Sequence, residues 1–248
     1  MPQVMIVTGG SRGIGAATIL HAVNAGYDVA FSYGADDAGA QKVVAAAEAR
    51  NGRILAVKAD MGTEAGVLEL FAACDGAFGA PNVLVNNAGI TGHIVRVADM
   101  TADDIRRLFD INVLGVFLAS REAVRRMSTA LGGQGGAIVN ISSRAATLGG
   151  AGEWVHYGAS KGAVDTMTIG LAREVAREGI RVNAIRPGLI DTEIHARGGA
   201  PERLEKLIPG VPMGRAGTAD EVAEAVMWLA SDAASYVTGS FIEVTGGR

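Results

Sequence analysis

The sequence predicts one α/β domain over residues 1–248, of the doubly wound Rossmann type, with a parallel sheet of seven strands. Three observations carry this prediction. Short strand-like runs alternate with helical segments from end to end, the runs are apolar on both faces, and a glycine-rich turn follows the first of them. Such strands, each followed by a helix, are typical of a parallel sheet covered by helices on both sides.

The expected elements follow one another in regular alternation. Strands are predicted where short runs are mostly β-branched or apolar, over 4–8, 28–33, 53–58, 82–86, 136–142, 180–185 and 240–244. Helices are predicted where apolar residues recur every third or fourth position, over 13–25, 37–50, 63–79, 102–130, 154–178 and 218–231. Gly26 ends the first helix and Asn51-Gly52 the second, as is usual at helix carboxyl termini.

One polar residue stands out within the helix expected over 102–130. An apolar stripe runs along this segment through Ile105, Leu108 and Val116, and Asn112 lies in the same apolar stretch. A polar amide there is either a satisfied hydrogen bond in the core or part of a functional relay. The sequence leaves both readings open.

Residues 187–217 do not show the pattern of a strand or a helix. They hold four of the six prolines and many glycines, including the Gly198-Gly199 pair. Irregular segments of this length within a compact domain are usually functional. We therefore expect a hinged substrate lid at about 189–213.

Composition and charge exclude several classes of protein. With 49% hydrophobic and 19% charged residues, the chain is not expected to be disordered. No run approaches the ~18 apolar residues of a membrane span, and the first residues do not resemble a signal peptide. A net charge of −4 without a basic block argues against nucleic-acid binding. Neither a membrane nor a nucleic acid is an expected partner.

The single cysteine and the four histidines indicate neither a disulfide nor a metal site. Cys74 lies in an apolar helical stretch, where a small buried hydrophobe is expected. One cysteine excludes an intrachain disulfide and fits a reducing, cytoplasmic compartment. The histidines, at 21, 93, 156 and 195, show no metal-ligand spacing.

The turn after the first strand suits a pyrophosphate. It reads Thr8-Gly9-Gly10-Ser11-Arg12-Gly13-Ile14-Gly15, with the spacing Gly-x3-Gly-x-Gly rather than G-x-G-x-x-G. Backbone N–H groups and the positive end of a helix bind phosphate groups, and a Cβ would block their close approach. This turn predicts a dinucleotide site.

Tyr157 and Lys161 form the second motif. Their spacing of four places both side chains on one face of a helix. Because a nearby cation favours the phenolate, Lys161 is expected to lower the pKa of Tyr157 toward the range of a general acid/base. The alternative is an ordinary exposed pair.

Two polar pairs end predicted strands at the sheet edge where α/β folds bind ligands. Asn86-Asn87 ends the fourth strand, and Ser142-Ser143 ends the fifth. The asparagines are expected either to contact a ligand or to satisfy loop backbone groups.

Together these residues resemble the short-chain dehydrogenase/reductase family, most closely its bacterial branch of 3-oxoacyl-carrier-protein reductases and glucose 1-dehydrogenases. The matching elements are TGGSRGIG at 8–15, NNAG at 86–89, the serine at 143, YGASK at 157–161 and RPGLIDT at 186–192. This ordered set is highly specific and covers essentially the whole chain. The resemblance implies a homotetramer.

The resemblance also implies roles for individual residues. Tyr157 is expected to be the acid/base, with Lys161 lowering its pKa and binding a ribose. Ser143 is expected to hydrogen-bond the substrate oxygen, and Asn112 to hold a water of the proton relay. The residues expected to contact the dinucleotide are Gly9, Ser11, Arg12, Gly13, Ile14, Gly15, Ser32, Asp60, Met61, Asn87, Ala88, Gly89, Tyr157, Lys161, Pro187, Gly188, Ile190 and Thr192.

The second strand favours NADP(H) as cofactor, with NAD(H) as the alternative. A site selective for NAD(H) places an acid there to bind the ribose hydroxyls. Here the strand ends in Ser32 and Tyr33, and the acids Asp36 and Asp37 come later. Arg12 in the glycine-rich turn can bind the 2′-phosphate as a guanidinium fork.

The predicted function is hydride transfer between NADP(H) and a small carbonyl or alcohol substrate. The alternative is a catalytically silent, dinucleotide-binding regulatory or structural subunit, which does not need an acid/base set. The substrate pocket is expected between 91–97, 144–156 and 189–213. These segments offer His93, Arg144, Glu153, Trp154, His156 and His195.

Overall fold

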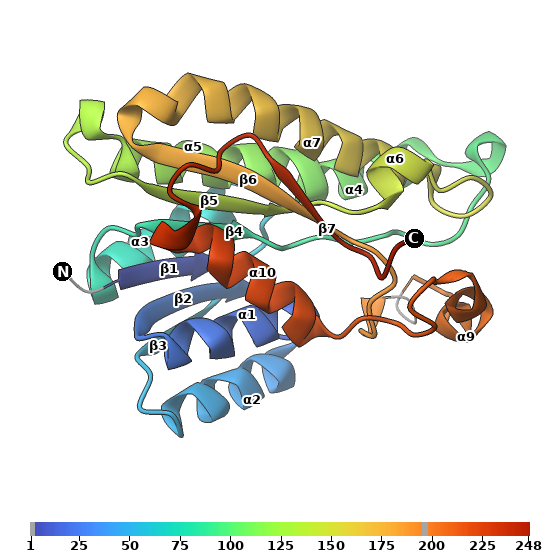
Figure 1. The fold of residues 1–248 in the computed structure, drawn as a ribbon, viewed down its shortest axis with the longest axis horizontal. Coiled ribbons are helices and arrows are strands. Elements are labelled where there is room, and N and C mark those ends of the chain that lie inside the picture. Colours follow the sequence, from blue (N-terminus) through green and yellow to red (C-terminus); the bar gives the residue numbers. More distant parts are fainter. Residues whose placement is uncertain (1–2, 195–197) are drawn as a thin grey trace.

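The computed structural model describes residues 3–194 and 198–248, which contain a parallel sheet of seven strands (Figure 1). The strand order is β3-β2-β1-β4-β5-β6-β7, so the order reverses between β1 and β4. The strands are β1 (Gln3–Val7), β2 (Tyr27–Tyr33), β3 (Ile54–Lys58), β4 (Val83–Asn86), β5 (Gly136–Ile141), β6 (Ile180–Pro187) and β7 (Phe241–Val244). The predicted fold class is confirmed.

Helices cover both faces of the sheet (Figure 1). One face packs against α1 (Gly13–Asn24), α2 (Asp37–Glu48) and α10 (Ala219–Ala230), and the other against α3 (Glu64–Phe78), α5 (Gly115–Met127) and α7 (Val155–Val175). The remaining α-helices are α4 (Ala102–Phe109), α6 (Ala145–Leu148) and α9 (Arg203–Leu207). Short 3-10 turns lie at Val97–Asp99, Thr129–Leu131, Ala176–Glu178, Ile208–Gly210 and Asp232–Ala234.

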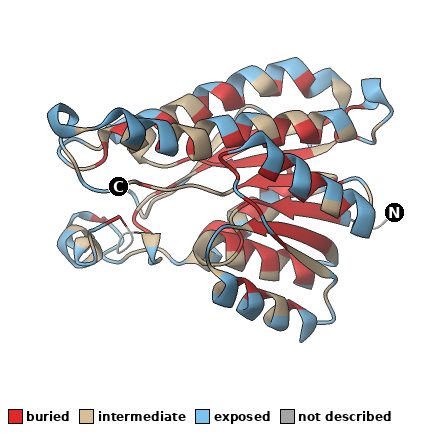
Figure 2. Cartoon of the chain, turned by 180° about the vertical axis from the view of Figure 1, so that it is seen from behind, coloured by how far each residue is buried: buried red, intermediate tan, exposed pale blue. Residues whose placement is uncertain are grey.

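The alternation of side chains along each strand produces two cores. Met5 and Val7 of β1 pack in the core beneath α1 and α10, whereas Val4 and Ile6 pack in the core beneath α3 and α5. Successive side chains of a strand point to opposite faces of a sheet. Figure 2 shows the buried residues concentrated in the strands and on the helix sides that face them. The strands are therefore apolar throughout because both faces are covered.

The helix expected over 102–130 differs from the prediction in two respects. Asp110–Leu114 form a π turn between α4 and α5, and the helix ends at Met127. At the π turn the backbone of Gly115 approaches Met61 so closely that a Cβ there would lie 2.1 Å from the Met61 oxygen. Ser128 then leaves the helical region with ψ 124°. Tertiary contacts rather than the apolar pattern thus decide this geometry.

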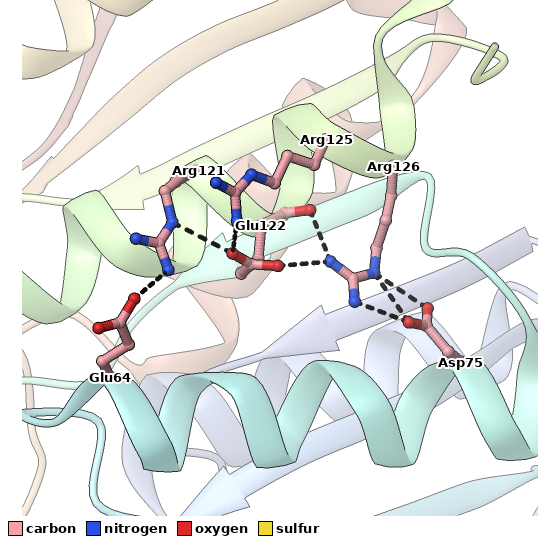
Figure 3. Close-up of polar contacts among 6 residues, drawn as sticks. All are labelled: Glu64, Asp75, Arg121, Glu122, Arg125 and Arg126. Carbon is pink, nitrogen blue, oxygen red and sulfur yellow. Dashed lines mark hydrogen bonds and ion pairs between the residues drawn. The ribbon is translucent and has the colours of Figure 1, made fainter. Parts of the chain in front are cut away.

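A buried carboxylate joins α3 to α5 (Figure 3). Glu122 is 4% exposed, and its oxygens accept hydrogen bonds from Arg121, Arg125 and Arg126 at 2.8–3.1 Å. Burial raises the pKa of Glu122, but the bonds from Arg126 and Arg121 lower it more, so the net direction is down. The network is completed by ion pairs of these arginines with Glu64 and Asp75 on α3.

Two further features of the described ranges concern membrane spans and metal sites. None of the helices described within 3–194 and 198–248 is long and apolar enough to cross a membrane. Across the same ranges, histidine, cysteine and acidic side chains do not gather in any group of three or more that could hold a metal ion.

Candidate active site

A cavity of about 840 Å³ opens at the carboxyl ends of the central strands. Its walls come from the turn after β1, the loop after β4, the end of β5, the start of α7 and the segment after β6. Parallel α/β sheets bind ligands at this edge, where the strand order reverses. The topology alone therefore brings the predicted motifs to one place.

Hydrogen bonds from neighbouring strands hold the glycine-rich turn. The Gly9 N–H donates to Ser32 Oγ at 3.1 Å, and Asn87 Nδ2 donates to the carbonyls of Thr8 and Gly9 at 3.0 and 2.8 Å. Gly9 has φ +69°, and a Cβ on Gly15 would lie 2.4 Å from the Gly9 oxygen. Residues of β2 and of the loop after β4 thus hold the turn, and it has glycine where a side chain would clash.

The cavity fits a dinucleotide at this turn. Helix α1 begins at Gly13, and among the described residues no side chain caps its first N–H groups. Gly13 and Ile14 line the cavity, and Thr192 lies above them, since a Cβ on Gly13 would be 3.3 Å from Thr192 Cγ2. An uncapped helix N-terminus aimed into a cavity is a ready site for a pyrophosphate.

Both asparagines of the fourth strand make contacts within the protein. Asn87 bonds the backbone of Thr8 and Gly9, as above, and also lines the cavity. Asn86 is 3% exposed, and its Nδ2 donates to Ser120 Oγ and Asn140 Oδ1 at 3.1 and 2.9 Å. Asn87 therefore satisfies backbone groups of the loop, as one of the two readings expected. Asn86 instead connects β4 to β5 and α5.

Ser32 lies in β2, as predicted, with its hydroxyl bonded to the glycine-rich turn. It is completely buried, and its hydroxyl accepts the bond from the Gly9 N–H. The described residues that line the cavity do not include it. Its side chain thus supports the turn, and contact of Ser32 with a cofactor stays a prediction.

Arg12 lines the cavity but is already paired. Its Nη2 lies 2.8 Å from Asp36 Oδ2, and its Nη1 lies 3.1 Å from Glu193 Oε2. Asp36 is also the N-cap of α2, accepting a bond from the Gly39 N–H at 3.1 Å. Lys58 at the end of β3 pairs with Asp37 at 2.9 Å. The expected phosphate site thus contains both cations and carboxylates.

Asp60 and Met61 lie after β3, beyond the described lining of the cavity. Asp60 pairs with Arg107 at 3.0 Å and accepts a bond from the Gly62 N–H at 2.9 Å. Burial raises the pKa of Asp60, but the bonds from Arg107 and Gly62 lower it further, below its usual range. Met61 is buried. The carboxylate is therefore anchored within the protein, and contact of this pair with adenine stays a prediction.

The structure brings Tyr157, Ser143 and Lys161 together on the cavity wall. Lys161 is 4% exposed, with Nζ 2.7 Å from the Ile141 carbonyl oxygen and 5.8 Å from the centre of the Tyr157 ring. Burial lowers the pKa of Lys161 to about 8, against a smaller opposite effect of Asp165. Lys161 is buried and Tyr157 half-buried, so they are not an ordinary surface pair.

The pKa of Tyr157 differs from the sequence-based expectation. Burial raises it, a side-chain hydrogen bond with Ser143 and the charge of Arg203 lower it, and the net direction is up. The ammonium of Lys161 lies 5.8 Å from the centre of the Tyr157 ring and bonds the Ile141 carbonyl. The net direction of the Tyr157 pKa is thus opposite to the expected one in the protein without a ligand, and an effect of Lys161 on it stays a prediction.

Asn112 is a satisfied amide. It is completely buried in the π turn, donates from Nδ2 to the Ile90 carbonyl at 2.8 Å and to Ser160 Oγ at 3.1 Å, and accepts from the Ile90 N–H at 2.9 Å. Both hydrogens of the Asn112 amide are thus donated in hydrogen bonds within the protein. Gly89 lies beside it, since a Cβ there would be 3.3 Å from Asn112 Oδ1 and 3.5 Å from Lys161 Nζ. The side chain therefore positions the loop after β4 against the site.

The two serines after β5 have separate environments. Ser142 is 2% exposed and donates to Asp165 Oδ1 at 2.5 Å, while Asp165 pairs with Arg186 at 2.9 Å. Ser143 lines the cavity together with Tyr157 and accepts a bond from the Ala145 N–H at 3.1 Å. Ser143 is thus the serine that can face a substrate.

The substrate end of the cavity only partly matches the expected set. Arg144, Glu153 and Trp154 line it, whereas His93 and His156 are not among the described lining residues and His195 lies outside the described residues. Arg203 and Leu207 of α9 also line the cavity; they lie within the expected pocket segment 189–213, but neither was singled out. They belong to a glycine- and proline-rich segment without periodicity, so no sequence signal indicated which of its residues face the cavity.

Comparisons with known proteins agree along the whole chain. A family model described as enoyl-(acyl carrier protein) reductase matches residues 9–248. An uncharacterized oxidoreductase of Escherichia coli K12, YgfF, is 50% identical over 245 residues, which cover 99% of either chain. The solved structure of a short-chain dehydrogenase/reductase from Serratia marcescens BCRC 10948 is 36% identical, with a TM-score of 0.91 over 99% of this chain and 97% of that one. A blue fluorescent protein from a metagenomic library, solved in complex with NADPH, is 36% identical with a TM-score of 0.90 over the same shares.

Proposed function

This chain belongs to the short-chain dehydrogenase/reductase family, as an NAD(P)-dependent oxidoreductase, and we propose that it transfers a hydride between NADP(H) and a small carbonyl or alcohol substrate, with Tyr157 as the acid/base. One observation carries the proposal. Tyr157, Ser143 and Lys161 lie together on the wall of the same cavity into which the uncapped start of α1 opens.

The proposed chemistry divides between cofactor and protein. The nicotinamide supplies or accepts the hydride. Ser143 and Tyr157 both present hydroxyls to the cavity, so a substrate oxygen can accept hydrogen bonds from them. In reduction the Tyr157 hydroxyl gives its proton to that oxygen, and in oxidation the phenolate takes it back.

The same cavity suggests how the dinucleotide is held. The N–H groups at the start of α1 bind the pyrophosphate, and Thr192 lies opposite Gly13 to cover it. The ammonium of Lys161, directed at the Ile141 carbonyl, is within reach of a ribose placed beside Gly89. Asn112 acts by holding the loop that carries Gly89, and its part in a proton relay stays a prediction.

We assign the preference for NADP(H) to Arg12. A guanidinium at the turn suits a 2′-phosphate, and a relative 36% identical was solved with NADPH. In the protein without a ligand, this guanidinium forms ion pairs with Asp36 and Glu193. Binding of the phosphate therefore requires Arg12 to exchange at least one carboxylate for it.

The decisive experiment compares turnover in the wild type and in Tyr157→Phe. The protein is offered a panel of carbonyls and alcohols, and the absorbance of reduced nicotinamide is followed. We expect turnover to fall about 10²–10⁴-fold, because the phenyl ring keeps the packing but has no transferable proton. Dinucleotide affinity, measured by titration calorimetry, is expected to survive.

Two results would contradict this proposal. Near-normal turnover of Tyr157→Phe on any accepted substrate would remove Tyr157 from the reaction. A wild type that binds the dinucleotide but turns over none of the panel would favour the silent subunit. Tyr33→Phe, another tyrosine of the described fold, is the matched control and is expected to keep full activity.

A further inference from the structure

Ser143, which lines the cavity, lies between two residues that are each bonded to a carboxylate. On one side, Ser142 Oγ donates to Asp165 Oδ1 of α7 at 2.5 Å. On the other side, Arg144 Nη1 lies 3.2 Å from Glu243 Oε1 of β7. The two neighbours of Ser143 are thus attached to different elements of the fold.

Arg186, the first residue of the motif at 186–192, joins these two carboxylates and has no part in the chemistry above. Its Nε and Nη2 lie 3.0 and 2.9 Å from Asp165 Oδ2, and its Nη1 lies 3.4 Å from Glu243 Oε1. One oxygen of Asp165 therefore bonds Ser142 and the other bonds Arg186. Asp165, Arg186 and Glu243 are called the Arg186 brace below.

Burial and packing restrict the brace to one arrangement. Asp165 is 8% exposed, and the Arg186 side chain is 18% exposed. The Cζ of Arg186 lies 4.1 Å from the centre of the Phe241 ring, and Arg186 is the register partner of Glu243 across β6 and β7. A planar guanidinium that pairs with two carboxylates and stacks on an aromatic ring has little freedom to turn.

The backbone on both sides of the serine contacts the strand that carries Arg186. The Ser142 N–H donates to the Ile185 carbonyl at 2.8 Å, and the Arg144 N–H donates to the Pro187 carbonyl at 3.0 Å. Strand β6 therefore holds this segment through its backbone, and through the Arg186 side chain as well.

We propose that Arg186 is a positioning residue for Ser143: by joining Asp165 to Glu243, it keeps the segment that carries the Ser143 hydroxyl in place on the cavity wall. The inference rests on the role proposed for Ser143 in bonding the substrate oxygen, and it deepens that role. Arg186 itself is not among the described residues that line the cavity, so it acts through this segment. A preorganised donor is effective only at the right position, and a displacement of ~1 Å can cost about 10²-fold in rate.

The first test follows the Ser143 hydroxyl in the full chain without substrate or cofactor. Ser143 Oγ accepts a bond from the Ala145 N–H at 3.1 Å, so hydrogen exchange resolved to this single amide reports how firmly the hydroxyl is held. In Arg186→Met, which keeps an apolar stem but has no charge, the Ala145 amide is expected to exchange roughly tenfold faster. The amide of Val139 in the middle of β5 is expected to keep its rate, which separates a local change from a general loss of stability.

Two further variants accompany this measurement. Ser142→Ala removes the bond to Asp165 without leaving a charge unpaired, and it is expected to act in the same direction if Arg186→Met does not fold. Arg181→Met is the matched control, because it removes another arginine of β6, whose guanidinium bonds backbone carbonyls of residues 229–231 at 2.8–3.4 Å. In this control the Ala145 amide is expected to exchange as in the wild type.

The second test is a double-mutant cycle in turnover of an accepted substrate. Alone, Arg186→Met is expected to lower kcat about tenfold to a hundredfold while dinucleotide affinity, measured by calorimetry, stays unchanged. In the Ser143→Ala background the same substitution is expected to have little further effect, because the hydroxyl that it positions is already absent. A general structural loss lowers kcat by the same factor in both backgrounds.

The proposal is overturned if the Ala145 amide of Arg186→Met and Ser142→Ala exchanges as in the wild type. It is also overturned if Arg186→Met lowers kcat equally with and without the Ser143 hydroxyl. Because the exchange measurement needs neither substrate nor turnover, a negative result there removes the role of Arg186 alone. The proposed reaction is decided separately, by the turnover of Tyr157→Phe.

Discussion

The pKa of the Tyr157 hydroxyl is subject to opposite effects: burial raises it, and Ser143 and Arg203 lower it. Burial prevails, since the net direction of its pKa is up despite Ser143 and Arg203. The protein without a ligand therefore holds Tyr157 as the phenol at neutral pH. That is the protonation state that can donate to a carbonyl oxygen, so the free site is prepared for reduction. Oxidation of an alcohol needs the phenolate and is expected to be favoured by higher pH.

Lys161 is expected to make dinucleotide affinity depend on pH. Burial lowers its pKa to about 8, so the ammonium is present below that pH and is lost as the pH rises through it. A bond from a charged donor contributes about 1.5–3 kcal/mol. Lys161→Met is therefore expected to weaken dinucleotide binding about tenfold or more at pH 6–7, and the wild type to approach the variant above pH 8.

Calorimetric titrations at several pH values check this expectation. Lys58→Met, which removes an exposed cation at the end of β3, serves as the comparison. Parallel pH curves for the wild type and Lys161→Met would mean that Lys161 does not touch the ribose.

Arg12 and Asp36 are expected to set the cofactor preference in opposite directions. Arg12→Ala should lower kcat/KM with NADP(H) about tenfold to a hundredfold relative to NAD(H), because a charge-assisted bond to phosphate is lost. Asp36→Asn keeps the N-cap of α2, since asparagine caps as well as aspartate does. It frees Arg12 from its closest carboxylate and should raise the preference for NADP(H).

Specificity constants with both cofactors measure the effect. Asp103→Asn, a similar exposed carboxylate at the start of α4, is the control and should leave the ratio unchanged. A wild type that favours NAD(H), or Arg12→Ala with an unchanged ratio, would refute the role of Arg12.

At the scale of elements, the segment between β6 and α10 is held differently at its ends and in its middle. Leu189, Ile190 and Val211, near its two ends, are buried. Between them, Glu193 pairs with Arg12 and Arg203 pairs with Glu153. Figure 1 shows α9 apart from the helices that cover the sheet. Exposed segments held by ion pairs are typical of regions of low local stability.

We therefore expect the described parts of the predicted lid, 189–194 and 198–213, to gain protection when a dinucleotide binds. Amide hydrogen exchange with and without NADP(H) measures this. Strand β5, buried in the centre of the sheet, is the internal reference and should not change. Strong and equal protection of both lid parts in the two states would show a rigid wall.

At the scale of the whole molecule, apolar side chains remain exposed on the outer helices. Leu114 and Phe117 lie one turn apart at the start of α5, and Ile169 lies on α7. Exposed apolar groups of this kind mark surfaces that another chain can cover. We expect the homotetramer that the family resemblance suggests, with these helices at one of its interfaces.

Light scattering coupled to size exclusion tests the assembly. Phe117→Arg is expected to lower the mass, because a charge at a buried interface is unfavourable. Leu131→Arg changes an equally apolar, exposed residue beyond the end of α5 and should leave the mass unchanged. A wild-type mass of one chain would contradict the tetramer, and an unchanged mass of Phe117→Arg would remove α5 from the interface.

The sequence by itself determined the order of elements and the residues that meet at the sheet edge. Its seven strands were predictable because strands buried on both faces are continuously apolar. The predicted 4–8 differs from β1 by one residue at each end, and 136–142 differs from β5 by one residue at its end. Tyr157, Ser143 and the glycine-rich turn were predictable for a related reason. Parallel strands bring their carboxyl ends to one edge, so motifs that follow strands meet there.

Tertiary structure alone decided what each of these side chains does. The bond of the buried Ser32 hydroxyl with Gly9, the two carboxylates on Arg12 and the contact of Arg203 with Glu153 join residues far apart in the chain. Hydrogen bonds and charge effects depend on distance and burial, which periodicity does not encode. The π turn at Asn112 has the same origin, because its amide bonds Ile90 and Ser160 across the fold. Local pattern thus specifies the elements, and packing between them specifies the chemistry.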